Sequence, residues 1–135
     1  MTKVVNRFGQ TNLYSIRKNS MTKVVINKCH GGFGLSDDAV MRYGELAGLN
    51  LVKTTSKYGS SLFYKEGRED NEHFFYANNL ERDDKYLVQV VEELEHMANG
   101  DYADLKVVEI PDGVEWYIDE YDGFEHIAET HRTWG

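Results

Sequence analysis

Residues 24–48 contain the pattern that most restricts the fold of this chain: an apolar run, a glycine-rich link and a helical stripe. The β-branched run at 24–26 predicts a buried strand, and the glycines in 31–34 end it, since glycine readily adopts positive φ angles. Ser36 predicts a helix N-cap, because two aspartates follow it in the first turn, where the helix dipole favours acids. The unit is therefore a strand, a loop and a helix that ends at Gly48.

A second helix is predicted from residue 84 to residue 98, because apolar side chains recur there at intervals of three and four. The members of this stripe are Leu87, Val90, Val91, Leu94, Met97 and Ala98. Asp83 or Asp84 is expected to cap the helix, and Asn99 with Gly100 to end it. The glutamates between these apolar positions are interpreted as a solvated face.

The C-terminal segment of the chain, residues 114–129, alternates apolar and polar side chains with the period of a strand. Asp122 and Gly123 in its middle predict a two-residue hairpin turn. The resulting register places three pairs of residues opposite each other: Tyr121 with Phe124, Ile118 with Ile127, and Asp119 with His126. A helix that begins near Phe124 stays open as an alternative, because several of the same residues also fit helical spacing.

A chain of 135 residues has room for one core of ordinary size, so we expect a single α+β domain over residues 21–135. The sheet is expected to be mixed or mainly antiparallel, with two helices on one face. Besides the C-terminal hairpin, strands are predicted at 50–55, 61–65, 72–77 and 105–110. Residues 1–20 are predicted to be a basic extension, because Met-Thr-Lys-Val-Val occurs at Met1 and again at Met21.

Charge is distributed unevenly along the chain. The net charge is -8, but residues 1–20 carry +4 and the remainder carries -12. An acidic body disfavours direct binding of nucleic acid and favours solubility, a basic partner protein or mimicry of nucleic acid. A single cysteine and the lack of a signal-peptide pattern favour the reducing cytoplasm, and no apolar run approaches the ~20 residues of a membrane span.

The glycine-rich loop is the first candidate site. Backbone N–H groups at a helix N-terminus bind anions, so sequestration of a nucleotide or similar small ligand is one hypothesis. The candidate ligand-binding residues are Gly31, Gly32, Gly34 and Ser36, with Cys29 beside them. The spacing matches neither common phosphate-binding glycine motif, and the two aspartates would repel phosphate, so a structural turn is the favoured interpretation.

Cys29 and His30 raise the hypothesis of thiol catalysis, because an imidazolium beside a thiol activates it. Adjacent residues on a strand point to opposite faces, so His126 or His131 would have to complete such a site. No metal or cofactor site is predicted, since the histidines and acids lack a recognised ligand spacing. We therefore assign no catalytic residue and expect a small, half-buried thiol.

The C-terminal hairpin is the second candidate site, because aromatic and acidic side chains are concentrated there. The two faces of the hairpin cannot both be exposed to solvent, so one of them is expected to pack on the helices. An exposed face rich in tyrosine and tryptophan is typical of protein contacts. The candidate partner-binding residues are Trp116, Tyr117, Asp119, Glu120, Tyr121, Phe124, His126 and Trp134. Base stacking on these rings is disfavoured by their acidic neighbours.

Several short segments of the sequence resemble a family of small proteins encoded by tailed bacteriophages and prophages. No activity is established for this family. The segments lie at residues 23–29, 31–36, 110–116, 121–123 and 131–134. The resemblance implies an accessory protein that binds and inhibits a host factor or a defence component in the host cytoplasm. We therefore expect a non-enzymatic binding protein, with self-association left open.

Overall fold

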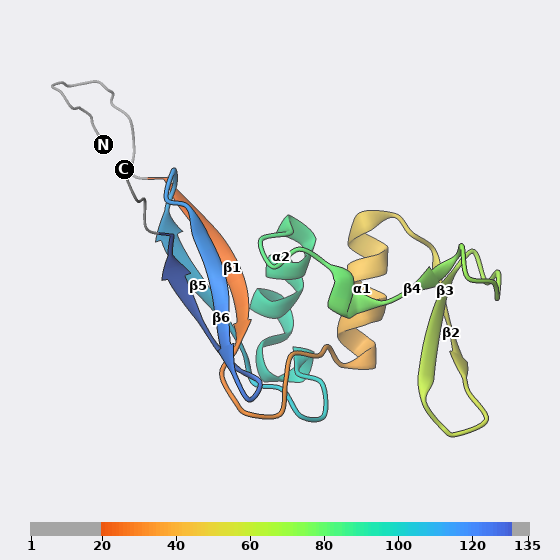
Figure 1. The fold of residues 1–135 in the computed structure, drawn as a ribbon. Coiled ribbons are helices and arrows are strands. Elements are labelled where there is room, and N and C mark those ends of the chain that lie inside the picture. The colour runs from red at the N-terminus through yellow and green to blue at the C-terminus, as the bar shows by residue number, and fades with distance from the viewer. Residues whose placement is uncertain (1–19, 131–135) are drawn as a thin grey trace, which may run out of the picture.

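The computed structural model describes residues 20–130, and within this range a pair of helices lies between small antiparallel sheets (Figure 1). This is the α+β class predicted from the sequence. The elements are β1 (Met21–Asn27), α1 (Asp37–Ala47), β2 (Leu51–Thr55), β3 (Ser61–Lys65), β4 (Phe74–Phe75), the 3-10 turn η1 (Ala77–Asn79), α2 (Lys85–Leu94), the 3-10 turn η2 (Glu95–Ala98), β5 (Leu105–Pro111), β6 (Trp116–Tyr121) and β7 (Phe124–Glu129).

The strands do not form the single sheet that we expected. Within residues 20–130, β1 pairs with β5, β2–β3–β4 form a second sheet, and β6 pairs with β7, all antiparallel. Figure 1 shows both helices between the β1–β5 strands and the β2–β4 sheet, so they do not share one face of one sheet. The physical reason is that the two helices pack on each other: the other apolar side of α2 packs on β1 and β5, and that of α1 packs on the β2–β4 sheet.

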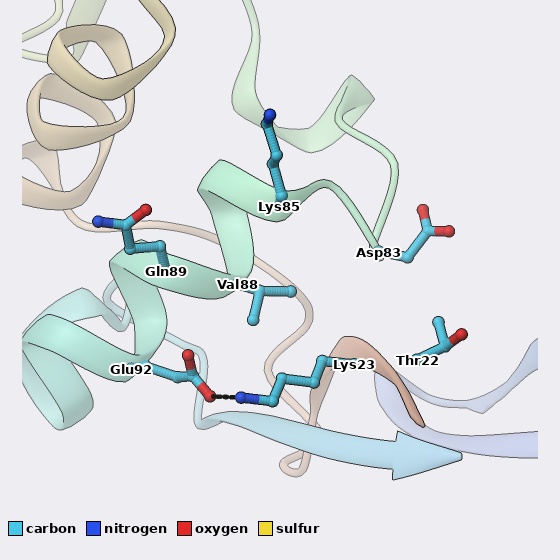
Figure 2. A pocket seen from close by; sticks show the side chains of 7 residues that line it. All are labelled: Thr22, Lys23, Asp83, Lys85, Val88, Gln89 and Glu92. Atoms are coloured by element: carbon cyan, nitrogen blue, oxygen red, sulfur yellow. Dashed lines mark hydrogen bonds and ion pairs between the residues drawn. The ribbon is translucent and has the colours of Figure 1, made fainter. Parts of the chain in front are cut away.

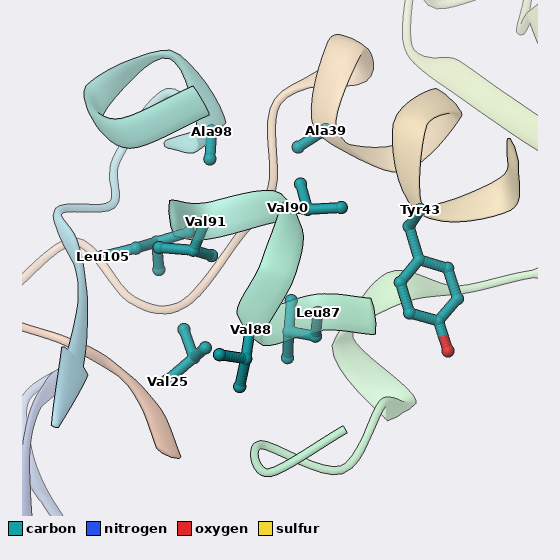
Figure 3. Close-up of a cluster of buried hydrophobic side chains, with 9 residues drawn as sticks. All are labelled: Val25, Ala39, Tyr43, Leu87, Val88, Val90, Val91, Ala98 and Leu105. Atoms are coloured by element: carbon teal, nitrogen blue, oxygen red, sulfur yellow. The ribbon is translucent and has the colours of Figure 1, made fainter. Parts of the chain in front are cut away.

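The main core lies around α2 (Figure 3). Leu87 and Val90 are fully buried and pack with Val25 of β1, Leu105 of β5 and Tyr43 of α1. The intervals of three and four that predicted this helix therefore correspond to its buried stripe. A smaller cluster of Val40, Leu51 and Phe63 joins α1 to the β2–β4 sheet.

The second helix is shorter than its apolar stripe predicted. Regular α-helix ends at Leu94, because Glu95 adopts a positive φ of 55° and the chain continues as the 3-10 turn η2. This change of direction exposes Met97 and buries Ala98, so a continuous helix to residue 98 is wrong. Asp84 is the N-cap, and its carboxylate accepts hydrogen bonds from two backbone N–H groups and from the hydroxyl of Tyr43.

The predicted ends of the first helix are confirmed. Ser36 is the N-cap and its hydroxyl accepts a hydrogen bond from the backbone N–H of Ala39, while Gly48 ends α1 with a φ of 72°. A Cβ atom on Gly44 would lie 2.8 Å from the side chain of Leu51, so this glycine lets α1 approach β2 closely.

The strand predicted at 72–77 is much shorter than expected, because only Phe74–Phe75 pairs with β3.

The C-terminal hairpin has the predicted register. Tyr121 lies opposite Phe124, Ile118 opposite Ile127, and Asp119 opposite His126. Asp122 and Gly123 have φ angles of 52° and 87°, which are the positive values that a two-residue hairpin turn of this type requires. The helical alternative for residues 124–129 is therefore wrong.

Replacing Asp37 with asparagine is expected to lower stability by less than about 1 kcal/mol at neutral pH, because both side chains of its ion pair with Lys53 are nearly half exposed. Hydrogen bonds from Lys53, at 2.9 Å, and from Ser61, at 2.7 Å, hold the pKa of Asp37 below its usual value. The stabilisation is thus present above about pH 4 and is lost as the pH falls through the pKa of the folded state. Thermal denaturation of both proteins between about pH 2 and 7 checks this, and a difference that grows on acidification would contradict it.

Candidate functional site

The two sequence candidates, the glycine loop and the C-terminal hairpin, meet in the structure. The ring of His30 lies 5.2 Å from the ring of Phe124 and 6.4 Å from that of Tyr121, measured between centroids. The ammonium group of Lys28 lies 4.7 Å above the Phe124 ring, a cation–π arrangement. We call the combined area the loop–hairpin surface; it consists of His30, Tyr102, Tyr117, Asp119, Tyr121, Phe124 and His126.

Two glycines let the loop and the hairpin turn approach this closely. A Cβ atom on Gly31 would lie 1.9 Å from the backbone oxygen of Tyr102, and one on Gly123 would lie 2.6 Å from that of His30. Both distances are far below van der Waals contact, so neither position has room for a side chain. Gly31 is therefore required by close packing inside the protein, as the structural interpretation of the loop predicted.

Asn27, at the end of β1, holds the loop and the hairpin turn together from beneath. Its side chain is fully buried and donates hydrogen bonds to the backbone oxygens of Cys29, at 2.7 Å, and Gly123, at 2.8 Å. Its side-chain oxygen accepts a bond of 2.8 Å from the backbone N–H of Asp104. One amide side chain thus connects three segments that are far apart in the sequence.

A buried ion pair lies next to Asn27. Glu125 of β7 is only 5% exposed, and its two carboxylate oxygens accept hydrogen bonds of 2.6 and 3.0 Å from the guanidinium group of Arg82. The backbone N–H of Asn27 donates a third bond to this carboxylate, at 2.8 Å. The guanidinium carbon lies 3.7 Å from the ring centroid of Phe33, so the pair is enclosed by an aromatic face as well.

The ion pair also closes one edge of β1. The backbone N–H groups of Val25 and Asn27 point away from β5, and they donate to the backbone oxygen of Arg82 and to the Glu125 carboxylate, respectively. Sequence reasoning did not assign Arg82, Asn27 or Glu125. The available signal was the position of Glu125: it shares the inward face of the hairpin with Ile118 and Ile127, and an acid on a buried face requires a cation.

Several polar atoms of the glycine-rich loop, residues 31–36, form hydrogen bonds with other segments of the protein. The hydroxyl of Ser36 caps α1 and donates to the backbone oxygen of Met97 at 2.7 Å, while its backbone N–H donates to Ala98. The backbone oxygen of Gly34 accepts a bond from Gly100. Gly31 packs against Tyr102, and Gly32 lies next to Gly123. These contacts account for Gly31 and Ser36 without a ligand, and the small-ligand hypothesis stays a prediction.

Cys29 and His30 do not lie on a strand, because β1 ends at Asn27. The Cys29 thiol points to the backbone oxygen of Tyr102, 3.0 Å away, whereas the His30 ring points to the hairpin. His126 pairs with Asp119 at 3.5 Å, and both side chains are more than half exposed, as expected for a surface ion pair. His131 lies outside the described residues.

The thiol of Cys29 is expected to react with iodoacetamide no faster than the thiol of a model peptide. Its sulfur is directed at a backbone carbonyl and has no histidine partner among the described residues. The measurement is the alkylation rate at about pH 7.5, below the pKa of an ordinary thiol, with an unfolded sample of the protein as the reference. A folded-state rate that exceeds the unfolded one would favour the thiol-enzyme hypothesis instead.

The exposed side of the hairpin carries most of the predicted partner-binding residues. Tyr121 is 79% exposed, Tyr117 is about half exposed, and Asp119, Glu120 and His126 also face solvent. The other candidates are placed differently. Trp116 is half-buried on the opposite face of β6, with Ile118, and Trp134 lies outside the described residues. Tyr102, which sequence reasoning did not consider, adds a further largely exposed ring beside Gly31.

Two polar hollows lie elsewhere on the molecule. One, of about 710 Å³, lies at the start of α1, next to the end of the glycine-rich loop; Ser36 lines it together with Asp37, Asp38, Lys53 and Asp101 among others. The other, of about 460 Å³, lies between β1 and α2; Figure 2 shows Lys23 reaching Glu92 across it at 2.8 Å. Within residues 20–130, no three histidine, cysteine or acidic side chains are placed to hold a metal ion.

Comparisons of the chain with protein-family models, with curated proteins and with solved structures gave no match. Among the described residues, no helix is both long and apolar enough to cross a lipid bilayer.

Proposed function

We propose that this chain is a small binding protein whose loop–hairpin surface contacts a basic surface of another protein. The observation that carries the proposal is the composition of the hairpin: residues 112–130 contain seven acids and neither lysine nor arginine. Glu125 is neutralised by Arg82, and among the described residues the other six acids form no ion pair with a lysine or arginine. A surface with one sign of charge accelerates association with a partner of the opposite sign and excludes partners of the same sign.

Aromatic side chains supply the second line of argument. Tyr102, Tyr117 and Tyr121 project from the same acidic region, and tyrosine is enriched among the residues that dominate binding energy at protein interfaces. The surface is held by Asn27 and by the buried Arg82–Glu125 pair, so little conformational order has to be created on binding. Charge provides attraction and selectivity, while the rings provide buried area.

The partner class follows from the acidic surface and from the resemblance to phage proteins. We propose that the partner is a host or defence-system protein in the bacterial cytoplasm and that binding inhibits or modulates it. A basic groove that ordinarily binds nucleic acid would be a suitable target, since the hairpin presents closely spaced carboxylates in place of phosphates. Competition between this protein and DNA for the captured partner would test that variant of the proposal.

The experiment is affinity capture from bacterial lysate with quantitative mass spectrometry, in which a triple neutralising variant on the hairpin is compared with a triple variant elsewhere. The hairpin variant carries Asp119→Asn, Glu120→Gln and Asp122→Asn. The control carries Glu66→Gln, Glu69→Gln and Glu72→Gln in and beside the β3–β4 connection, and it changes the net charge equally. A partner retained by the wild type and the control but lost by the hairpin variant supports the proposal; equal loss from both variants would contradict it.

A further inference from the structure

We propose that the outer edge of β6 binds an extended basic segment of the partner as an added antiparallel or parallel strand. This inference rests on the proposed function and specifies how the same surface recognises its partner. Addition of a strand to an open sheet edge gives affinity through backbone hydrogen bonds and selectivity through alternate side chains.

The hydrogen bonding of the hairpin shows which backbone groups are directed to this edge. The N–H of Thr130 donates to the oxygen of Glu115, at 2.9 Å, which makes that pair a hydrogen-bonded one. Hydrogen-bonded and non-hydrogen-bonded pairs alternate in an antiparallel ladder, so Trp116, Ile118 and Glu120 direct their N–H and C=O groups away from β7.

Nothing in the described residues of the chain pairs with this edge. The β6–β7 sheet has two strands, and β7 is the strand of the hairpin that packs against β1. Three backbone donors and three acceptors of β6 therefore form an open row along a strand of 6 residues, which is a template for pairing with another strand. Natural proteins commonly protect such an edge with charged side chains, lysine above all, or with proline; β6 has no lysine or proline, and its charged residues, Asp119 and Glu120, are both acidic.

The side chains beside the edge define the charge of the segment that fits it. Tyr117, Asp119 and Tyr121 project to the exposed face at intervals of two residues, and Glu120 is exposed as well. Opposite charges on neighbouring strands stabilise a sheet, whereas like charges destabilise it. A segment with lysine or arginine at alternate positions would place its cations beside Asp119 and its backbone against the open row.

The outer edge of β2 provides an internal comparison. Bonds from Ser56 to Ser60 and from Glu66 to Asn50 show by the same reasoning that Leu51, Lys53 and Thr55 point their backbone groups away from β3. Residues 51–65 contain three lysines and no acid, so this edge repels a basic segment. These two edges therefore differ in charge, and of the two, that of β6 suits the proposed partner.

The test is amide hydrogen exchange of the full chain, followed by NMR, with and without a capped ten-residue peptide of alternating lysine and threonine. We expect the exchange rates of the Trp116, Ile118 and Glu120 amides to fall at least tenfold at saturating peptide. The amides of Lys53 and Thr55, at the control edge, should not change, and a matched glutamate–threonine peptide should have no effect at β6.

Each other outcome counts against one of the two proposals or both. Binding of the lysine peptide without protection at these three amides would overturn strand addition while leaving the acidic surface as the binding site. Absence of binding at low salt would contradict the proposed function together with this inference. Protection that rises with protein concentration in the absence of peptide would show that a second copy occupies the edge, and would also overturn the inference.

Discussion

Replacing Arg82 with methionine is expected to destabilise the protein by about 3–5 kcal/mol, because the Glu125 carboxylate would remain buried without its cation. The side chains of the two residues are 18% and 7% exposed, so water cannot replace the lost partner without opening the structure. The substitution also removes the guanidinium group from the ring of Phe33. Urea denaturation followed by circular dichroism measures the change.

Two further variants separate the cost of an unpaired charge from a general effect of substitution. Arg42→Met removes an arginine whose ion pairs with Glu93 and Glu45 are more than a third exposed, and we expect little change. The double variant Arg82→Met with Glu125→Leu removes both charges and should be more stable than Arg82→Met alone, since no buried charge is left. If the double variant is the less stable of the two, the explanation by an unpaired buried carboxylate is incorrect.

Replacing Gly31 with alanine is the second substitution for which we expect a large effect, about 1–3 kcal/mol or more. The added methyl group would lie 1.9 Å from the backbone oxygen of Tyr102, and a backbone atom cannot rotate away as a side chain can. The loop would have to move off its neighbours, which would also weaken the contact of the Cys29 thiol with Tyr102. Thermal and urea denaturation both report this change.

Gly34→Ala is the matched control within the same loop. No atom lies within 4 Å of the position that a Cβ atom on Gly34 would occupy, and its φ is not positive. We expect a change within about 0.5 kcal/mol. Equal destabilisation by the two substitutions would contradict the explanation by the close approach of Gly31 to Tyr102.

Local signals in the sequence predicted much of the fold. Ser36 and Gly48 mark the ends of α1 because each satisfies backbone groups within a few residues of itself. The turn at Asp122 and Gly123 likewise determined the whole register of β6 and β7, since a two-residue turn leaves one pairing. The helix ends and the hairpin register depend on residues that are close together in the sequence, so they can be predicted from the sequence alone.

The features that were missed depend on contacts between distant segments. Periodicity continued through Met97 and Ala98, but Glu95 turns the chain, so that Ala98 packs into the core while Met97 is exposed. The pair of Arg82 with Glu125 joins residues 43 positions apart, and no local pattern indicates which cation an inward-facing acid will meet. The meeting of the glycine loop with the hairpin turn has the same cause, so the two candidate sites looked separate in the sequence.

The most direct test of the loop–hairpin surface as a binding site is the affinity of two matched tyrosine variants for the captured partner. Tyr121 and Tyr58 are 79% and 84% exposed, and they lie on different hairpins, β6–β7 and β2–β3. We predict that Tyr121→Ala weakens binding at least tenfold, about 1.4 kcal/mol, while Tyr58→Ala leaves Kd unchanged. Unchanged affinity for Tyr121→Ala, or an equal loss for Tyr58→Ala, would contradict the assignment of this surface.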